Sequence, residues 1–256
     1  MKYAILFGVA LFMLVSLVVG SRLLWLFKRT RKAPELFMAL ALLCAGFLAF
    51  AVGTIGKVLI VGHPELRTPL TILGLCFEYI GCSAMALFAW RVFHQKKAWA
   101  KATVTLFFVL AASVFAAELS TGEYLRYSDT QLSSGPWIPL ALVVRGLAPT
   151  WLSFECFRFH RQLRRRARIG LAEPLVVQRV GLWGLAMLAS ALAYVVPVLH
   201  RLVYHTGLRD HLWAITTVSV LATVSAIALW WAFFPPQGYR KRMAMMSLSD
   251  AGPDSR

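Results

Sequence analysis

The sequence predicts an all-α integral membrane protein: a bundle of seven helices, with the N-terminus outside and the C-terminus in the cytoplasm. Hydrophobic residues make up 59% of the 256 residues, and the mean hydropathy is +0.67. Charged residues make up only 15%, whereas a soluble domain of this size carries about a quarter. A third observation, the distribution of basic residues, sets the orientation.

Basic residues gather in segments that alternate with the apolar runs. Twenty of the 27 Lys and Arg lie at 22–32, 91–101, 158–179 and 240–256. The third segment holds seven arginines, and an arginine at the centre of a membrane helix costs about 2.5–3.5 kcal/mol. Short loops this basic stay in the cytoplasm. Contact with anionic membrane lipids then accounts for the net charge of +16, and no nucleic-acid partner is expected.

The first three spans are predicted at 3–27, 36–61 and 69–93. One lysine precedes the first span, and five basic residues follow its apolar stretch. A cleaved signal peptide has the opposite distribution of basic residues. We therefore expect an uncleaved anchor with its N-terminus outside. The second and third begin just after Pro34 and at Pro69, and proline in the first helical turn loses no hydrogen bond.

The remaining spans are predicted at 102–118, 137–157, 176–199 and 211–234. Pro136 and Pro174 precede the fifth and sixth spans in the same way. Aromatic residues at 230–234 form an interfacial belt at the inner end of the seventh. Six or eight spans would place one basic segment on the wrong side of the membrane. The helical domain thus covers 1–242, and the polar tail 243–256 is predicted to be disordered.

Glu78 and Arg145 are the ionisable residues placed deepest in the predicted spans. Both spans run from outside to inside, and the two residues lie nine and eight positions past Pro69 and Trp137. At about 1.5 Å per residue, each lies about 12–13 Å below the outer surface of a core roughly 30 Å thick. Equal depth and opposite charge predict an ion pair.

Pro149 adds to the interest of this region, because its ring excludes the hydrogen bond to the carbonyl of Arg145. Charges and broken backbone at membrane depth are typical of ligand sites, switches and water-filled cavities. One interpretation is a ligand or switch site formed by Glu78, Arg145 and Pro149. The other is a structural ion pair that holds two helices in register. The sequence does not decide between them.

A secondary ion pair is predicted between Lys57 and Glu118, at the outer ends of neighbouring spans. For this pair an interfacial contact with a snorkelling lysine is the simpler interpretation. Glu155, near the inner end of the fifth span, is expected to make a solvated contact with Arg158.

Several functions are excluded by missing residues. The seventh span has no lysine for a retinal Schiff base, and no histidines lie at membrane depth to bind haem. Protease motifs are absent. Four histidines lie on the outer side, at 63, 200, 205 and 211, without the spacing of a zinc motif. No metal, no cofactor and no enzymatic activity are expected.

Two stretches resemble known proteins. RRRARIGLAEPLVVQRVGLWGLA, at 164–186, and LWWAFFPPQGYRKRM, at 229–243, resemble segments of uncharacterised bacterial seven-transmembrane proteins. Their layout is similar to the seven-helix sensor region of some bacterial histidine kinases. No kinase core follows Arg242, and the resemblance transfers no functional residue. It implies signalling through a separate cytoplasmic protein.

The predicted function is therefore that of a receptor-like or sensory protein of the bacterial cytoplasmic (inner) membrane, without a catalytic domain. An unknown small ligand would enter from the outer face toward Glu78 and Arg145. The alternative is a small transporter or channel subunit. Transporters usually contain inverted repeats, and no internal repeat is visible here.

Overall fold

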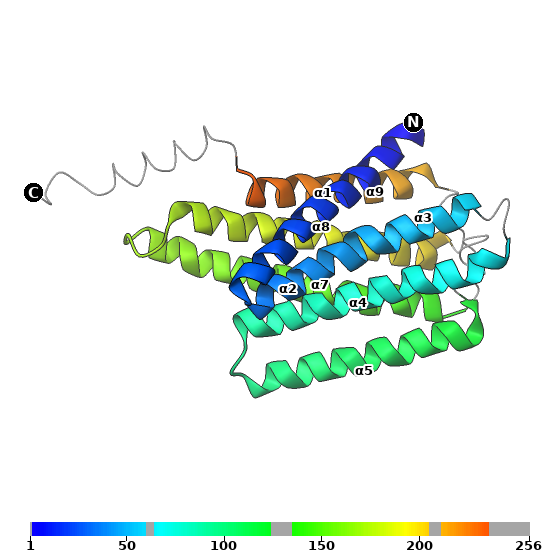
Figure 1. Cartoon of the computed structure of the whole chain (residues 1–256), viewed down its shortest axis with the longest axis horizontal. Helices are drawn as coiled ribbons and strands as arrows, with labels where there is room; N and C mark the ends of the chain where they lie inside the picture. Colours follow the sequence, from blue (N-terminus) through cyan, green and yellow to red (C-terminus); the bar gives the residue numbers. More distant parts are fainter. Residues whose placement is uncertain (1, 60–63, 124–134, 205–210, 236–256) are drawn as a thin grey trace, which may run out of the picture.

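The computed structural model describes residues 2–59, 64–123, 135–204 and 211–235 and places them in an all-helical bundle without strands (Figure 1). Seven helical segments in this part of the chain are long and apolar enough to cross a membrane. The helices are α1 (Lys2–Thr30), α2 (Ala33–Leu40), η1 (Ala41–Leu48), α3 (Ala49–Leu59), η2 (Pro64–Leu66), α4 (Arg67–Phe93), α5 (Ala98–Thr121), α7 (Trp137–Ala167), α8 (Pro174–Tyr204) and α9 (Leu212–Phe233). The predicted tail at 243–256 lies outside the described residues.

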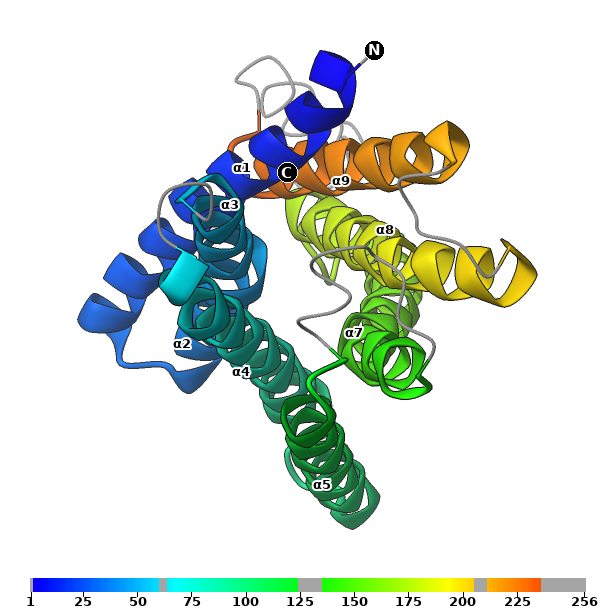
Figure 2. The ribbon, with the colours of Figure 1, turned by 90° about the vertical axis from the view of Figure 1, so that its right-hand side faces the viewer.

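Six spans form a ring, and the seventh packs outside it. Around the ring, α1 contacts the second span, that span contacts α4, and α4 contacts α7; α8 and α9 then lead back to α1. Figure 2 shows α5 at the edge of the bundle, next to α4 and α7. This arrangement places one face of α5 against the ring and leaves large apolar side chains such as Leu106 and Val109 exposed. An exposed apolar face of this kind suits contact with lipid.

The second span contains a π-helix that the sequence does not reveal. Residues 41–48 form η1 between α2 and α3, and the amide of Ala49 donates to the carbonyl of Cys44, five residues earlier. A π-helix is rare and frequently occurs at functional sites. Its sequence, ALLCAGFL, contains no proline or polar residue that would indicate a change of helical period. The second predicted span is therefore helical throughout, but its hydrogen-bonding pattern changes from α to π at residues 41–48.

Helices α7 and α8 are longer than predicted. The expected fifth span ends at 157, but α7 continues to Ala167, so most of the arginine-rich segment is helical and does not form a loop. Gly170 ends the helix with a φ of 72°. The amide of Leu171 donates to the carbonyl of Arg166 at 2.9 Å, and that of Gly170 to Ala167 at 3.1 Å. These two bonds form a Schellman motif, which needs a left-handed residue at the glycine.

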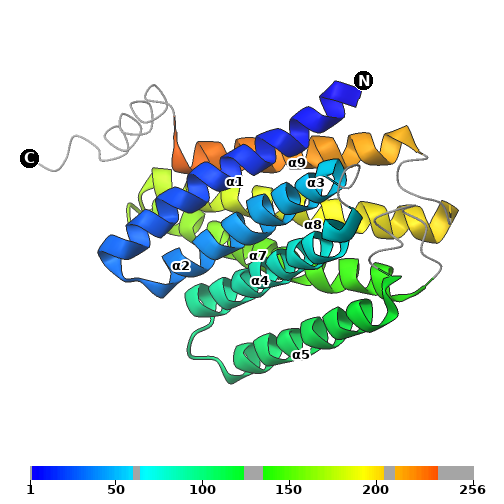
Figure 3. The same ribbon diagram turned by 45° about the vertical axis from the view of Figure 1, so that its right-hand side comes forward.

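Figure 1 shows that the hairpin of α7 and α8 extends past the neighbouring helices at the arginine-rich end of the bundle, and in Figure 3 the same hairpin lies behind α1. Small residues let the two helices approach closely. A Cβ at Gly184 would lie 3.1 Å from the Phe157 ring, and one at Gly146 would lie 3.2 Å from Tyr194. Ser153 donates across the pair to the carbonyl of Gly184 at 3.1 Å. Close approach and interhelical hydrogen bonds are the main means by which membrane helices associate.

Candidate functional site

Arg145 lies at the meeting point of α4, α5 and α7, and only 6% of it is exposed. One guanidinium nitrogen donates to Glu78 of α4 at 2.5 Å, and another donates to Glu118 of α5 at 3.4 Å. The third, Nε, donates to the carbonyl of Ala141 on its own helix at 3.1 Å. Each nitrogen of the buried cation therefore has an acceptor, as burial of a charge requires.

Two tyrosines complete the network around the carboxylates. Tyr79 donates to Glu118 at 2.8 Å, and Tyr194 of α8 donates to Glu78 at 3.0 Å. Each carboxylate thus accepts one bond from a tyrosine and one from Arg145. We call these five residues the Arg145 cluster. Hydrogen bonds to ionised groups are stronger than neutral ones, so the cluster joins α4, α5, α7 and α8 at one depth.

The contact expected between Glu78 and Arg145 is present, and Glu118 joins it. The sequence placed Glu118 at the outer interface beside Lys57, but Glu118 is fully buried and faces Arg145 and Tyr79. The side chain of Lys57 lies outside the described residues. The predicted position of Glu118 was wrong because α5 extends to Thr121, which moves the glutamate about one turn inside the helix.

Tyr79 and Tyr194 were not identified from the sequence. Tyr79 follows Glu78 directly, and Tyr194 lies in an otherwise apolar stretch of the sixth span. Their position inside predicted spans could have indicated that each hydroxyl makes a hydrogen bond, because a buried tyrosine usually finds a partner. That signal does not say which partner is found, since it depends on how the helices are rotated.

The carboxylates outnumber the cation in the cluster. Glu78 and Glu118 both contact Arg145, and no second basic side chain among the described residues contacts either of them. The two acids also differ in exposure: the side chain of Glu78 is 23% exposed, and that of Glu118 is 1% exposed. Of the two acids, Glu78 is therefore the one that another molecule can reach.

A cavity of about 230 Å³ lies inside the ring, and Glu78 forms part of its wall. All six ring spans contribute lining residues, including Pro149 from α7, Tyr194 and Ser190 from α8, and Gly46 from η1. The lining is predominantly apolar, with a few polar groups. This combination of an apolar cavity and a few convergent polar groups is typical of small-molecule sites.

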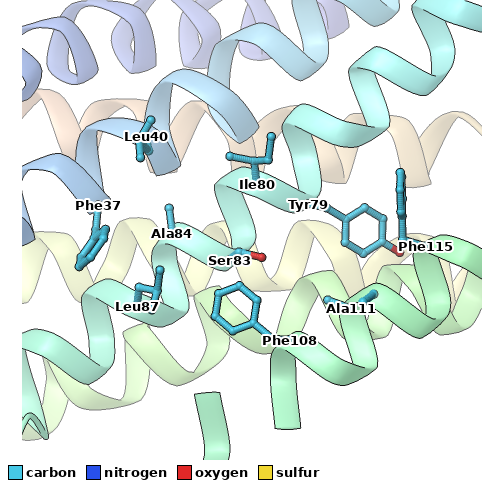
Figure 4. Close-up of a pocket in the computed structure, with 11 residues that line it drawn as sticks. Phe37, Leu40, Tyr79, Ile80, Ser83, Ala84, Leu87, Phe108, Ala111 and Phe115 are labelled. Carbon is cyan, nitrogen blue, oxygen red and sulfur yellow. The ribbon is translucent and has the colours of Figure 1, made fainter. Parts of the chain in front are cut away.

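A second hollow, of about 390 Å³, lies between α2, α4 and α5 on the other side of Tyr79 (Figure 4). Its walls are almost wholly apolar and include Phe37, Leu87 and Phe108. In Figure 4 the ring of Tyr79 points toward Phe115, and the two rings meet edge to face with centroids 5.2 Å apart. Tyr79 thus lies between this hollow and Glu118 of the Arg145 cluster.

Glu155 is buried, in contrast to the solvated contact expected from the sequence. It is 4% exposed and lies 2.8 Å from Nε2 of His94, at the end of α4. Arg158 is farther away, at 4.0 Å, and its side chain is 55% exposed. The expected contact with Arg158 is therefore present, but Glu155 is not solvated, because the packing of α4 on α7 brings His94 against it.

Two of the four histidines that the sequence predicted on the outer side also meet. His200 is 1% exposed, and its Nε2 lies 2.8 Å from Nδ1 of His211. The other two, His63 and His205, lie outside the described residues. Among the described residues, no three His, Cys, Asp or Glu side chains come together in a group that could hold a metal ion.

Removal of the Tyr79 hydroxyl tests whether the cluster stabilises the bundle. Tyr79→Phe is expected to lower the free energy of unfolding by about 1–3 kcal/mol, because it removes the donor to a buried carboxylate. The measurement is detergent-induced unfolding of the purified protein, followed by tryptophan fluorescence. Tyr204→Phe is the matched control, because Tyr204 lies at the end of α8 and is exposed. Equal stability of both variants would contradict the prediction.

Comparisons of the chain with protein-family models, with curated proteins and with solved structures find no match.

Proposed function

We propose that this protein is a receptor-like sensor of the bacterial cytoplasmic membrane that binds a small ligand in the central cavity. It has no catalytic domain and signals through a separate cytoplasmic protein. The observation that carries the proposal is the continuity of α7. This one helix bears Arg145 and Pro149 beside the cavity and five arginines in its final ten residues.

The length of α7 supports a role in transmission. Its 31 residues extend about 46 Å at about 1.5 Å per residue, against a hydrocarbon core of roughly 30 Å. From Arg145 to Ala167 the distance along the axis is about 33 Å. A displacement at the cavity would therefore reach the basic end without crossing a loop.

Contacts between α7 and α8 favour movement of the hairpin as a unit. Beyond the cavity, Ser153 bonds the carbonyl of Gly184, and Nδ1 of His160 lies 2.8 Å from the carbonyl of Val177. Above these contacts, Pro149 removes one backbone hydrogen bond from α7. Such a break gives the helix a place to bend between the cluster and the basic end. If α7 exists in a straighter and a more bent form, a ligand that binds one form more tightly shifts the populations toward that form.

Transmission along α7 from the cavity to its arginine-rich end can be tested without knowing the ligand. The test removes the ion pair between Arg145 and Glu78. Spin labels at Gln95→Cys, in the turn just after α4, and Gln162→Cys report the distance between that turn and the arginine-rich end of α7, and both native residues are exposed. The background carries Cys76→Ser, because Cys76 is the one cysteine that is not fully buried. In this background Glu78→Gln is expected to shift the distance distribution by several ångströms.

Glu65→Gln is the matched control, because it neutralises a carboxylate at the opposite end of α4, in η2. It is expected to leave the distance distribution unchanged. An unchanged distribution in Glu78→Gln would mean that the cluster does not control the basic end, and the sensor proposal would fail.

The alternative is a small transporter or channel subunit, and the cavity is the observation that favours it. Proteoliposomes distinguish the two functions, because a sensor produces no flux. Uptake of a cavity ligand into vesicles, at a rate that Glu78→Gln abolishes, would favour transport.

A further inference from the structure

We infer that the central cavity binds a protonated amine attached to a small apolar body, with the ammonium group against Glu78. This inference rests on the proposed function in one respect: it takes the cavity as the ligand site. It adds the chemical class of the ligand, which follows from the charge, the hydrogen-bonding capacity and the size of the cavity.

The charge of the cavity wall is negative. Among the described residues that line it, Glu78 is the only charged one. Arg145 does not line the cavity and divides its positive charge between Glu78 and Glu118, at 2.5 and 3.4 Å. With both carboxylates ionised, these three groups carry one net negative charge. A monovalent cation at Glu78 would balance it, and an anion would add to the repulsion.

The hydrogen-bonding groups of the wall also favour a donor. A serine hydroxyl has one proton and two lone pairs. Ser190 and Ser225 both donate to the carbonyl of Ala186, at 3.0 and 3.1 Å. The two hydroxyl oxygens also lie 3.1 Å from each other, and each keeps at least one lone pair that can accept a hydrogen bond. Tyr194, the other hydroxyl in the lining, donates its proton to Glu78.

The backbone adds to this acceptor character. Pro149 lines the cavity and has no amide to donate to the carbonyl of Arg145. An ammonium group offers up to three donors and no acceptor, which matches a wall of acceptors.

Size and aromatic lining define the rest of the ligand. A cavity of roughly 150 Å³ holds benzene, and this one measures about 230 Å³. It therefore has room for an aromatic ring and a short aminoalkyl chain. Phe12 and Phe50 line the cavity and meet edge to face, with centroids 6.4 Å apart. Aromatic faces attract cations as well as apolar rings.

The test compares phenethylamine with phenethyl alcohol, which has the same ring and chain but no charge. Binding to the purified full chain in lipid nanodiscs at neutral pH is measured by calorimetry, with sodium chloride added to equalise ionic strength. The amine is expected to bind at least about tenfold more tightly than the alcohol, because a hydrogen-bonded ion pair exceeds a neutral hydrogen bond. Equal affinity, or binding of neither compound, would overturn the inference.

Two variants separate charge from shape. Glu78→Gln removes the contacting carboxylate, and Glu118→Gln removes the excess charge without altering the lining. Each is expected to reduce amine affinity about tenfold or more and to leave alcohol affinity unchanged, whereas Glu173→Gln, in the exposed turn before α8, should change neither. If both variants lose alcohol binding as well, or if Glu118→Gln keeps the full preference for the amine, the charge argument is wrong.

The outcome is independent of the spin-label experiment. Binding is measured on the isolated chain, whereas the spin-label distance requires no ligand. If the amine binds but the spin-label distance at the arginine-rich end of α7 is unchanged in Glu78→Gln, this inference holds and the sensor function is wrong. If the distance changes but the amine does not bind, the sensor function holds and the amine is not the ligand class.

Discussion

Arg145→Met is expected to lower the free energy of unfolding by about 3–5 kcal/mol, because it leaves two carboxylates buried without the guanidinium they share. Methionine keeps an unbranched side chain of similar length, so the loss is mainly electrostatic. The measurement is the detergent-induced unfolding described for Tyr79→Phe. Arg158→Met is the matched control, because it removes an arginine from the same helix where the side chain is 55% exposed, and its effect is expected to stay below about 1 kcal/mol.

A compensating variant tests the cause of that loss. Arg145→Met combined with Glu78→Gln and Glu118→Gln removes all three charges together. Replacement of a complete buried ion pair or triad by well-packed hydrophobic residues of similar volume is often close to neutral for stability, and the triple variant likewise leaves no charge of the cluster in place. The triple variant is therefore expected to recover most of the stability lost in Arg145→Met. A triple variant as unstable as the single one would show that the shape of Arg145, and not its charge, holds the helices together.

The sequence predicted the contact of Glu78 with Arg145 because both depths could be counted from well-marked helix starts. Pro69 and Pro136 mark the beginnings of two helices that run in the same direction, so small errors in the boundaries cancel. Glu118 had no such reference, because its helix ends in the run ELSTG, which hydropathy does not divide sharply. A few residues of error at that end moved the glutamate from the buried cluster to the interface.

Features that depend on helix rotation and packing could not be predicted. The apolar pattern of α5 resembles that of the other spans, yet α5 packs outside the ring and contributes no described lining residue to the cavity. In a membrane, the lipid-facing and protein-facing sides of a helix are both apolar, so periodicity carries little information about orientation. The meeting of His94 with Glu155 depends on the same packing.

The packing of α4 on the π-helix is another feature that the sequence does not reveal. Gly81 of α4 packs against Ala45, in the middle of η1. A Cβ on Gly81 would lie 2.5 Å from the backbone nitrogen and from the Cβ of Ala45, and 3.0 Å from its Cα. The two helix backbones are therefore nearly in contact, and because the nearest atoms include backbone they cannot rotate away.

Gly81→Val is expected to lower the free energy of unfolding by about 1–3 kcal/mol, since overpacking forces the neighbouring elements apart. Gly81 lies one turn from Glu78 on α4, so separation of α4 from η1 would also move Glu78 relative to Arg145. Amine binding should weaken together with stability. The measurements are detergent unfolding and calorimetry on the same preparation.

Gly53→Ala is the matched control, because the site on α3 has no atom within 4 Å of an added Cβ. Alanine favours a helix over glycine by about 1 kcal/mol, so this variant is expected to be as stable as the native protein or more stable. The two substitutions have the same helix-propensity sign and opposite expected effects on stability. If Gly81→Val were also stabilising, the close approach of α4 to the π-helix would be incorrect, and with it the position of Glu78 on the cavity wall.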